Sequence, residues 1–149
     1  MAANFLQEGL KLMLETFFQN SASAPASFKV GLASAVTAPI TAGNGTLTDL
    51  TELSGNTYAR QLLARAASAL PTTPGFTSSN QSTNAAQVAA DAVIFENTSL
   101  VTWTEAVGAF LCTVEGKLIA YLPLSTGRTL LAGDSLTVTI TGLKLTEGV

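Results

Sequence analysis

Residues 103–124 read WTEAVGAFLCTVEGKLIAYLPL, and this stretch decides the fold class. The pair Glu115-Gly116 separates two runs that are mostly apolar. Two such runs joined by a short turn that contains glycine predict a β-hairpin, with residues 117–124 as the returning strand. Gly108 lies inside the first run, where a glycine predicts a bulge or a kink.

Short runs of the same kind recur through the rest of the chain, at intervals of about ten residues. They cover residues 28–32, 58–63, 93–95, 130–131, 136–140 and 143–145. Roughly seven or eight short strands are typical of sandwiches and barrels. We therefore predict a mainly β fold, an antiparallel β-sandwich or small jelly-roll-like barrel with one N-terminal α-helix. From residue 88 onward we expect the strands to follow one another as a β-meander.

One amphipathic helix is expected at residues 4–19. Its apolar residues recur at helical spacing, and Asn4 with Gln7 has the spacing of a capping box. The face is wide and must pack against the chain's own sheet or against a neighbouring subunit. The apolar positions are Leu6, Leu10, Met13, Leu14, Phe17 and Phe18. We divide the chain into an N-terminal helix or arm, 1–24, and a β-sandwich domain, 25–149.

Two further segments leave alternatives open. Residues 60–70 are rich in alanine and leucine and would suit a helix, but we favour a strand for the first half. Residues 71–84 contain two prolines, one glycine and no charge, which predicts an exposed loop. Such a long loop either contacts neighbouring molecules or is mobile.

The composition favours a protein that assembles. Charged residues make up 11% of the chain, against roughly 25% in typical soluble domains. The surface must then consist largely of neutral polar and small residues, which cost much less to desolvate than ions. Threonine on the outer faces of strands adds no charge that would keep sheet edges apart. We expect a homo-oligomer, with an unusually neutral monomer as the alternative.

Several partners are excluded by the sequence. The net charge is −3 and the seven basic residues never cluster, so we expect no binding to nucleic acid. No run approaches the roughly 18 apolar residues that span a bilayer, and no signal peptide is visible. We therefore expect synthesis in the cytoplasm and no membrane partner.

Groups for catalysis are sparse. The chain has no histidine, and its one cysteine, Cys112, lies in an apolar run where we expect a buried side chain rather than a reactive thiol. Asp49 and Glu52, or Glu96 and Glu105, are not forced together by their spacing, so we interpret them as solvated carboxylates. No acidic run matches a calcium loop. We predict no enzyme activity, no cofactor, no metal and no small-molecule ligand.

The most informative polar residues surround the turn 54–56. Glu52 and Arg60 flank this turn and could face each other across a hairpin as a partly buried ion pair that fixes strand register. Tyr58 and Trp103 are expected to pack in a core or an interface through their rings. The alternative is that these two rings present an open face to sugars.

The segment LTELSGNTYARQ, residues 50–61, resembles the E-x-x-G-x-x-Y-x-R segment of small virion proteins of tailed bacteriophages. These are known as capsid decoration (cement) proteins and also as tail-fibre-like proteins. The order of features over residues 28–145 is similar as well. The chain differs at residues 104–106, where a glycine-led turn is more usual, and by its added helix.

The resemblance implies a β-sandwich-like virion protein without catalysis. In this hypothesis the chain forms a homo-oligomer, a trimer by expectation, binds the major capsid protein and stabilises the shell from the capsid surface. Glu52, Tyr58, Arg60, Gln61 and Trp103 are then expected to serve structure and assembly. The alternative is a tail-fibre or receptor-binding module that recognises host surface glycans with Trp103, Tyr58 and the loop 71–84.

Overall fold

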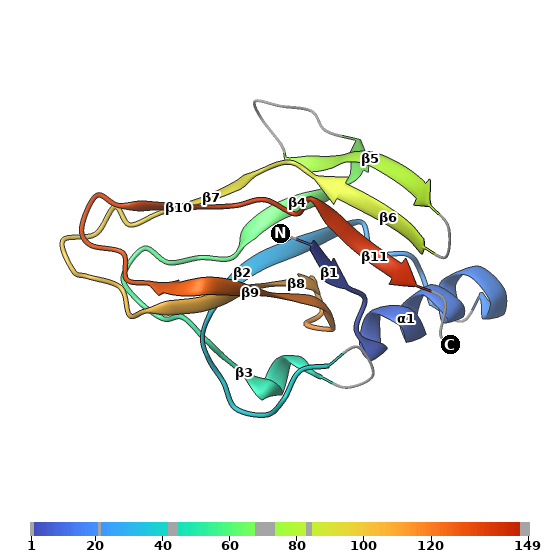
Figure 1. Cartoon of the computed structure of the whole chain (residues 1–149), viewed down its shortest axis with the longest axis horizontal. Helices are drawn as coiled ribbons and strands as arrows, with labels where there is room; N and C mark the ends of the chain where they lie inside the picture. The colour runs from blue at the N-terminus through green and yellow to red at the C-terminus, as the bar shows by residue number, and fades with distance from the viewer. Residues whose placement is uncertain (1, 21, 42–44, 68–73, 83–84, 147–149) are drawn as a thin grey trace.

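The computed structural model describes residues 2–20, 22–41, 45–67, 74–82 and 85–146. Within these ranges the chain forms one long curved sheet, a smaller sheet, one N-terminal helical segment and a short 3₁₀ helix, Leu47–Asp49 (Figure 1). The helical segment comprises α1 (Gln7–Leu14) and a following π-helical turn (Glu15–Gln19). The strands are β1 (Ala2–Asn4), β2 (Ser27–Val36), β3 (Leu50–Glu52), β4 (Gln61–Ala67), β5 (Gly75–Ser82), β6 (Ala85–Ala90), β7 (Val93–Glu96), β8 (Ala106–Thr113), β9 (Leu118–Arg128), β10 (Ser135–Val138) and β11 (Gly142–Thr146).

The strands confirm the predicted mainly β class with one N-terminal helix. In the described part of the chain the larger sheet has nine strands, in the order β1-β11-β6-β5-β4-β2-β8-β9, with β3 also paired to β2. The sheet curls until its two edges approach each other, and β7 pairs with β10 beside it (Figure 1). The result is a nearly closed barrel.

The N-terminal segment joins the two edges of this barrel. β1 pairs in parallel with β11, and the backbone N–H of Phe5 donates to the carbonyl of Lys144 at 3.1 Å. One residue later the N–H of Leu6 donates to the carbonyl of Ile119 in β9 at 2.8 Å. The first residues of the predicted arm 1–24 thus contribute a strand to the sheet of the barrel.

The predicted start of the helix is wrong. Asn4 lies in β1, the helix begins at Gln7, and Leu6 occupies the N-cap position without a side-chain hydrogen bond. The backbone N–H groups of residues 5 and 6 donate to β11 and β9, so this stretch is extended, and the first helical hydrogen bond runs from the N–H of Leu10 to the carbonyl of Leu6. Asn20, with φ of 48°, adopts the left-handed conformation that ends the helical segment.

The broad apolar face predicted for the helix is covered only in part. Leu6 and Leu12 are buried, and Gly9 allows close contact with Ile119 of β9. By contrast, the last turn is open: Leu14 is 55% exposed, Phe17 77% and Phe18 83%. The helix therefore packs on its own barrel with its first half and leaves three large apolar side chains uncovered.

Alternation along β2 separates two apolar layers. Val30 and Leu32 point into the barrel, whereas Ala33 belongs to an outer cluster on which Ile40 and Leu47 pack. Gly31 pairs with Phe110, and a Cβ on this glycine would lie within contact distance of the Phe110 ring. The ring therefore occupies the space that a side chain at position 31 would take. The outer cluster comprises Leu6, Ala33, Leu50, Phe110, Cys112 and Leu118.

The hairpin predicted from residues 103–124 is present. β8 pairs with β9, and Gly116 in the connecting turn has φ of 91°. The register of the pair shifts between Ala106 and Gly108, which confirms the predicted irregularity. The returning strand β9 is longer than predicted because it continues to Arg128.

Two other predictions are wrong. The strands after residue 88 do not form a simple meander, because β7 pairs with β10 and β11 pairs with β6. The loop expected at 71–84 contains β5, which pairs with β4 and β6; residues 71–73 and 83–84 lie outside the described residues. Neutral polar residues suffice for β5 because backbone groups make these pairings. For residues 60–70 the strand alternative is correct as far as Ala67.

Candidate functional site

The predicted site residues surround a loop, residues 53–60, that interrupts one edge of β2. β3 and β4 run along the same edge of β2, opposite residues 33–36 and 27–30. The chain leaves this edge after Glu52 and returns at Gln61. The prediction that Glu52 and Arg60 face each other across a hairpin is therefore wrong. The two residues lie at the two ends of a loop that interrupts the pairing along one edge of β2. We call residues 53–60 the motif loop.

Tyr58 supplies a hydrogen-bond partner for β2 where the motif loop interrupts the strand pairing. The carbonyl of Leu32 accepts from the N–H of Leu53 at 2.8 Å, but no strand residue reaches the N–H of Leu32. This N–H donates to the Tyr58 hydroxyl at 2.8 Å, and the hydroxyl donates to Oε1 of Glu52 at 3.0 Å. Leu32 is fully buried, so an unpaired N–H there would be costly. The phenol stands in for a missing strand partner.

The ion pair expected between Glu52 and Arg60 is present. Nε and Nη2 of Arg60 donate to the two carboxylate oxygens of Glu52 at 2.8 and 2.7 Å, a bidentate arrangement. The guanidinium also lies 5.3 Å from the centroid of the Phe110 ring, and Nη1 is 3.5 Å from Sγ of Cys112. The pair thus ties both ends of the motif loop to the outer apolar cluster.

The electrostatics of this group stabilise the charged carboxylate. Burial alone would raise the pKa of Glu52, but hydrogen bonds from Arg60 and Tyr58 and the Arg60 charge lower it below its ordinary value. Burial raises the pKa of Tyr58, and the adjacent Glu52 carboxylate raises it further. Burial also raises the pKa of Cys112, which disfavours a reactive thiolate. A carboxylate held ionised by two donors is a poor proton acceptor, so this geometry serves structure.

Trp103 anchors the middle of the motif loop. Its indole Nε1 donates to the carbonyl of Asn56 at 2.8 Å, and the side chain is 2% exposed. A Cβ on Gly55 would lie 2.8 Å from the indole ring, so only glycine permits this approach. Tyr58 packs edge-on against Trp103 at 5.6 Å between ring centroids. The open aromatic face considered for sugar binding is therefore not formed by these two rings.

Gln61 has a local role in the structure. Its side-chain amide donates to the carbonyl of Ala59 at 3.0 Å, at the point where the motif loop returns to β4. Among the predicted residues, Glu52, Tyr58, Arg60 and Trp103 meet around the loop. The spacing E-x-x-G-x-x-Y-x-R follows from that geometry, because each named position meets β2, β8 or the indole.

A second polar centre escaped the sequence analysis. Asn97 is fully buried, and its Nδ2 lies within hydrogen-bonding distance of the carbonyls of Val101, Leu130 and Leu131, at 2.9, 3.0 and 3.1 Å. Its Oδ1 accepts from the backbone and the hydroxyl of Ser99. One side chain thus joins residues 97–105 to residues 129–134. An asparagine directly after a strand is a common turn residue, so its type alone gave no signal.

These two joined loops form an end of the molecule that we call the tip. In Figure 1 they lie at the left, opposite α1 along the longest axis. Three apolar side chains are exposed there: Leu100 at 96%, Val101 at 56% and Leu131 at 56%. The hydrogen bonds of Asn97 hold the backbone beneath two of them. The tip therefore presents three exposed apolar side chains on a backbone that hydrogen bonds hold in place.

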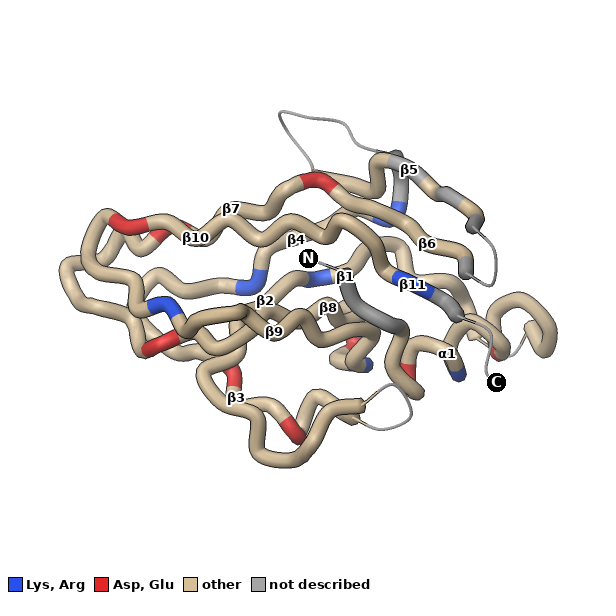
Figure 2. The backbone as a smooth tube through the Cα atoms, in the orientation of Figure 1, with Lys and Arg blue, Asp and Glu red and all other residues tan. Residues whose placement is uncertain are grey.

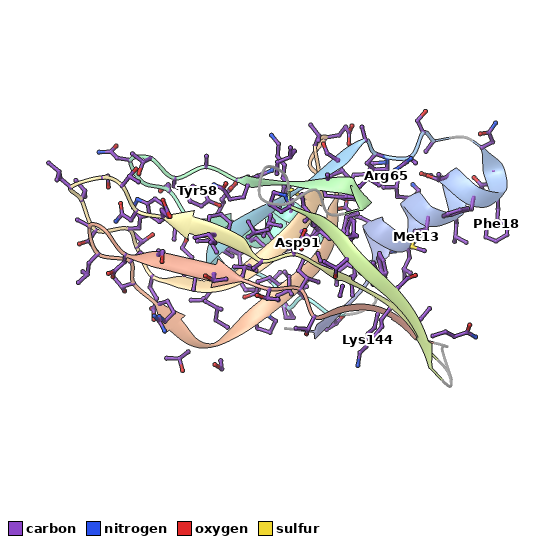
Figure 3. The ribbon with its side chains drawn as sticks, turned by 90° about the horizontal axis from the view of Figure 1, so that it is seen from above. Met13, Phe18, Tyr58, Arg65, Asp91 and Lys144 are labelled. Carbon is purple, nitrogen blue, oxygen red and sulfur yellow. The ribbon has the colours of Figure 1, made fainter. Side chains whose placement is uncertain are left out.

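At the opposite end, α1 and the barrel enclose an apolar pocket of about 550 Å³, which we call the mouth pocket. Figure 3 shows Met13, Phe18 and Arg65 at this end and Tyr58 toward the other. The lining residues come from the helical segment, the residues just before and after it, and seven strands. They are Phe5, Gly9, Leu12, Met13, Thr16, Phe17, Ala24, Pro25, Phe28, Arg65, Phe76, Val88, Leu111, Ile119 and Leu143.

Charged residues are few and scattered along the backbone, as Figure 2 shows. In the described ranges no three His, Cys, Asp or Glu side chains gather in a way that could hold a metal ion. Nor does any helix in the described part have the length and apolar character needed to cross a bilayer.

The fold and these sites define a small β-barrel structural protein whose motif residues lock a loop and whose two ends are apolar. The chain matches the family described as podophage GP4 fiber I protein gp80 over residues 7–146, nearly its whole length. It therefore belongs to this family of phage fibre proteins. A comparison with curated proteins finds no match. The predicted class, a structural protein of a bacteriophage virion, is confirmed.

Proposed function

We propose that the chain is a building block of a virion fibre that works by packing against copies of itself and against its neighbours in the particle, without catalysis. The observation that carries this proposal is the uncovered apolar surface at both ends, Leu100 at the tip and Phe17 and Phe18 on the last helical turn. Large exposed apolar groups on a rigid body mark surfaces that become covered. The fibre name of the family supports the same role.

Within this proposal the working unit is a homotrimer. The low content of charge supports self-association, since neutral surfaces are cheaper to desolvate than charged ones. Sedimentation of the purified chain should give three times the 15.3 kDa of one chain. A single species with the mass of one chain at every concentration would contradict both the trimer and the packing role.

The location of the protein is tested on particles. Mass spectrometry of purified virions should detect the chain, and immunogold labelling should place it on tail-associated fibres. Deletion of its gene should yield particles that lack these fibres and retain a shell. Absence of the chain from purified particles would refute the proposal.

The same particles test the decoration hypothesis. A decoration protein binds the major capsid protein, so gold label would cover the shell and the purified chain would bind empty capsids. The low surface charge suits this role as well as the fibre role, whereas the family name favours the fibre. Label on the shell would replace the fibre assignment by the decoration assignment.

Recognition of host glycans stays a proposal for the fibre as a whole. Trp103 is buried and the Tyr58 hydroxyl is engaged by Leu32 and Glu52, so any sugar contact must use other residues of this chain. A glycan array probed with the purified chain tests this directly. Signal that survives Tyr58→Phe would support recognition by another surface.

A further inference from the structure

The two ends of the molecule differ in shape. The tip projects, with Leu100 almost fully exposed, whereas the opposite end contains the mouth pocket. A pocket of about 550 Å³ is large enough to receive a leucine and a valine side chain together, since sites for small molecules span roughly 300–1,000 Å³. A projection at one end and a hollow at the other are complementary in form.

The charges of the two ends are complementary too. The tip loops, 97–105 and 129–134, carry Glu105 and Asp134, which gives a net charge of −2, and the flanking Glu96 and Arg128 leave this sum unchanged. Of the residues that line the mouth pocket, the charged one is Arg65, which is exposed and has no ion-pair partner among the described residues. An apolar projection with acidic neighbours therefore meets an apolar hollow with a cation at its wall.

The tip is also organised in advance. Asn97 holds the carbonyls of Val101 and Leu131, and the side chain of Asp134 accepts from the N–H of Leu131 at 2.9 Å. A loop fixed in this way loses little conformational entropy when it docks. The open last turn of the helix, with Phe17 at the wall of the pocket, would be covered by the same contact.

We propose that the tip of one molecule docks into the mouth pocket of a second copy of this chain. The contact is head to tail, so a docked pair keeps one free tip and one free pocket. Further copies can therefore add until the assembly closes into a ring or extends as a row. This inference rests on the proposed function, to which it adds the two surfaces that meet between successive subunits of the fibre. A contact made by one loop and one pocket is small, so it is weak for a single pair and gains strength through repetition.

The test uses two surface variants of the full chain. Leu100→Glu places a charge on the tip, and Phe17→Glu places one at the wall of the pocket; both positions are exposed, so both variants should fold with wild-type melting. Leu62→Glu is the matched control, because Leu62 is an exposed apolar residue, at 48%, that belongs to neither surface. Arg65→Glu is a second pocket variant if Phe17→Glu melts early.

Sedimentation velocity is measured from about 10 μM to 1 mM, the range in which small interfaces associate. The average mass of the wild type and of Leu62→Glu should rise with concentration, and that of each end variant should stay constant. An equimolar mixture of Leu100→Glu and Phe17→Glu should form a species whose mass is the sum of those of the two variants alone. That result is expected because one intact tip meets one intact pocket.

Three results would overturn the proposal. They are a constant mass for the wild type, association of Leu100→Glu equal to that of the wild type, and a mixture that forms no summed species. Association of Leu100→Glu, or a mixture without a summed species, would indicate contacts between two identical surfaces rather than between a tip and a pocket. Because the measurement uses the purified chain, its failure is distinct from absence of the protein from virions, which would refute the proposed function.

Discussion

Removal of one hydroxyl, in Tyr58→Phe, should destabilise the barrel through the motif loop. The hydroxyl accepts the N–H of Leu32 at 2.8 Å and donates to Glu52 at 3.0 Å. Without it the buried N–H of Leu32 has no partner, which costs about 1–3 kcal/mol. Glu52 is 31% exposed, so water replaces much of the second bond. We expect a loss of about 2 kcal/mol in the free energy of unfolding.

Urea denaturation followed by tryptophan fluorescence measures this loss, because Trp103 is the single tryptophan and contacts Tyr58. For a chain of this length the melting temperature should fall by roughly 4–8 °C. Tyr121→Phe is the matched control. The Tyr121 hydroxyl makes no hydrogen bond to the described part of the chain, so its loss should cost less than about 0.5 kcal/mol.

A double-mutant cycle separates the two bonds of the Tyr58 hydroxyl. Glu52→Gln keeps the shape of the side chain, so combining it with Tyr58→Phe should show coupling of about 0.5–1 kcal/mol. The larger part of the Tyr58→Phe loss should persist in the Glu52→Gln background, because it arises at Leu32. Equal stabilities for Tyr58→Phe and the wild type would refute the assignment of the phenol as a strand partner.

The remaining predictions concern the same loop and the tip. Arg60→Ala should lower the free energy of unfolding by about 1–2 kcal/mol, since it leaves a half-buried carboxylate without its cation; normal melting and normal oligomer formation would contradict this. The lowered pKa of Glu52 stabilises the fold above its ordinary value of 4.5, so the advantage of the wild type over Glu52→Gln in urea should vanish as pH falls through the folded pKa. Asn97→Asp should be destabilising at pH 7, because a carboxylate would face three carbonyl oxygens and its pKa would be raised in the folded state; its deficit relative to the wild type should shrink at pH 4. Gly55→Ala should melt below the wild type, because its methyl group would lie 2.8 Å from the Trp103 ring, and an unchanged melting temperature would show that the loop shifts freely.

Features that depend on neighbouring residues were predictable. The hairpin of β8 and β9 follows from two apolar runs and the Glu115-Gly116 turn, because each strand meets the next one along the chain. The ion pair between Glu52 and Arg60 was predictable for the same reason, since only the motif loop separates the two residues. The surfaces that bury this ion pair and the motif loop, which are the outer cluster and Trp103, were not predictable from the sequence.

Features that depend on distant partners were missed or misjudged. β5 has little apolar periodicity, so its sequence predicts a loop, because its place in the sheet depends on the free edges of β4 and β6. Likewise, the apolar periodicity and the Asn4–Gln7 spacing predict a helix from residue 4, although β11 and β9 engage the backbone of residues 4–6. Asn97 is an ordinary turn residue in the sequence and becomes a buried centre through carbonyls of residues 130 and 131.

The sequence by itself determined the β class, the hairpin, the sparse charge and a motif of fixed spacing, since these follow from residue types and local order. The tertiary structure alone decided what the motif does. It placed the Tyr58 hydroxyl on the N–H of Leu32, 26 residues away, and the Gly55 backbone against the indole of Trp103. It also placed the exposed tip opposite α1, which lines the mouth pocket. The physical reason is that burial and the pairing of polar groups depend on which distant segments meet, and one residue's chemistry does not specify its distant partner.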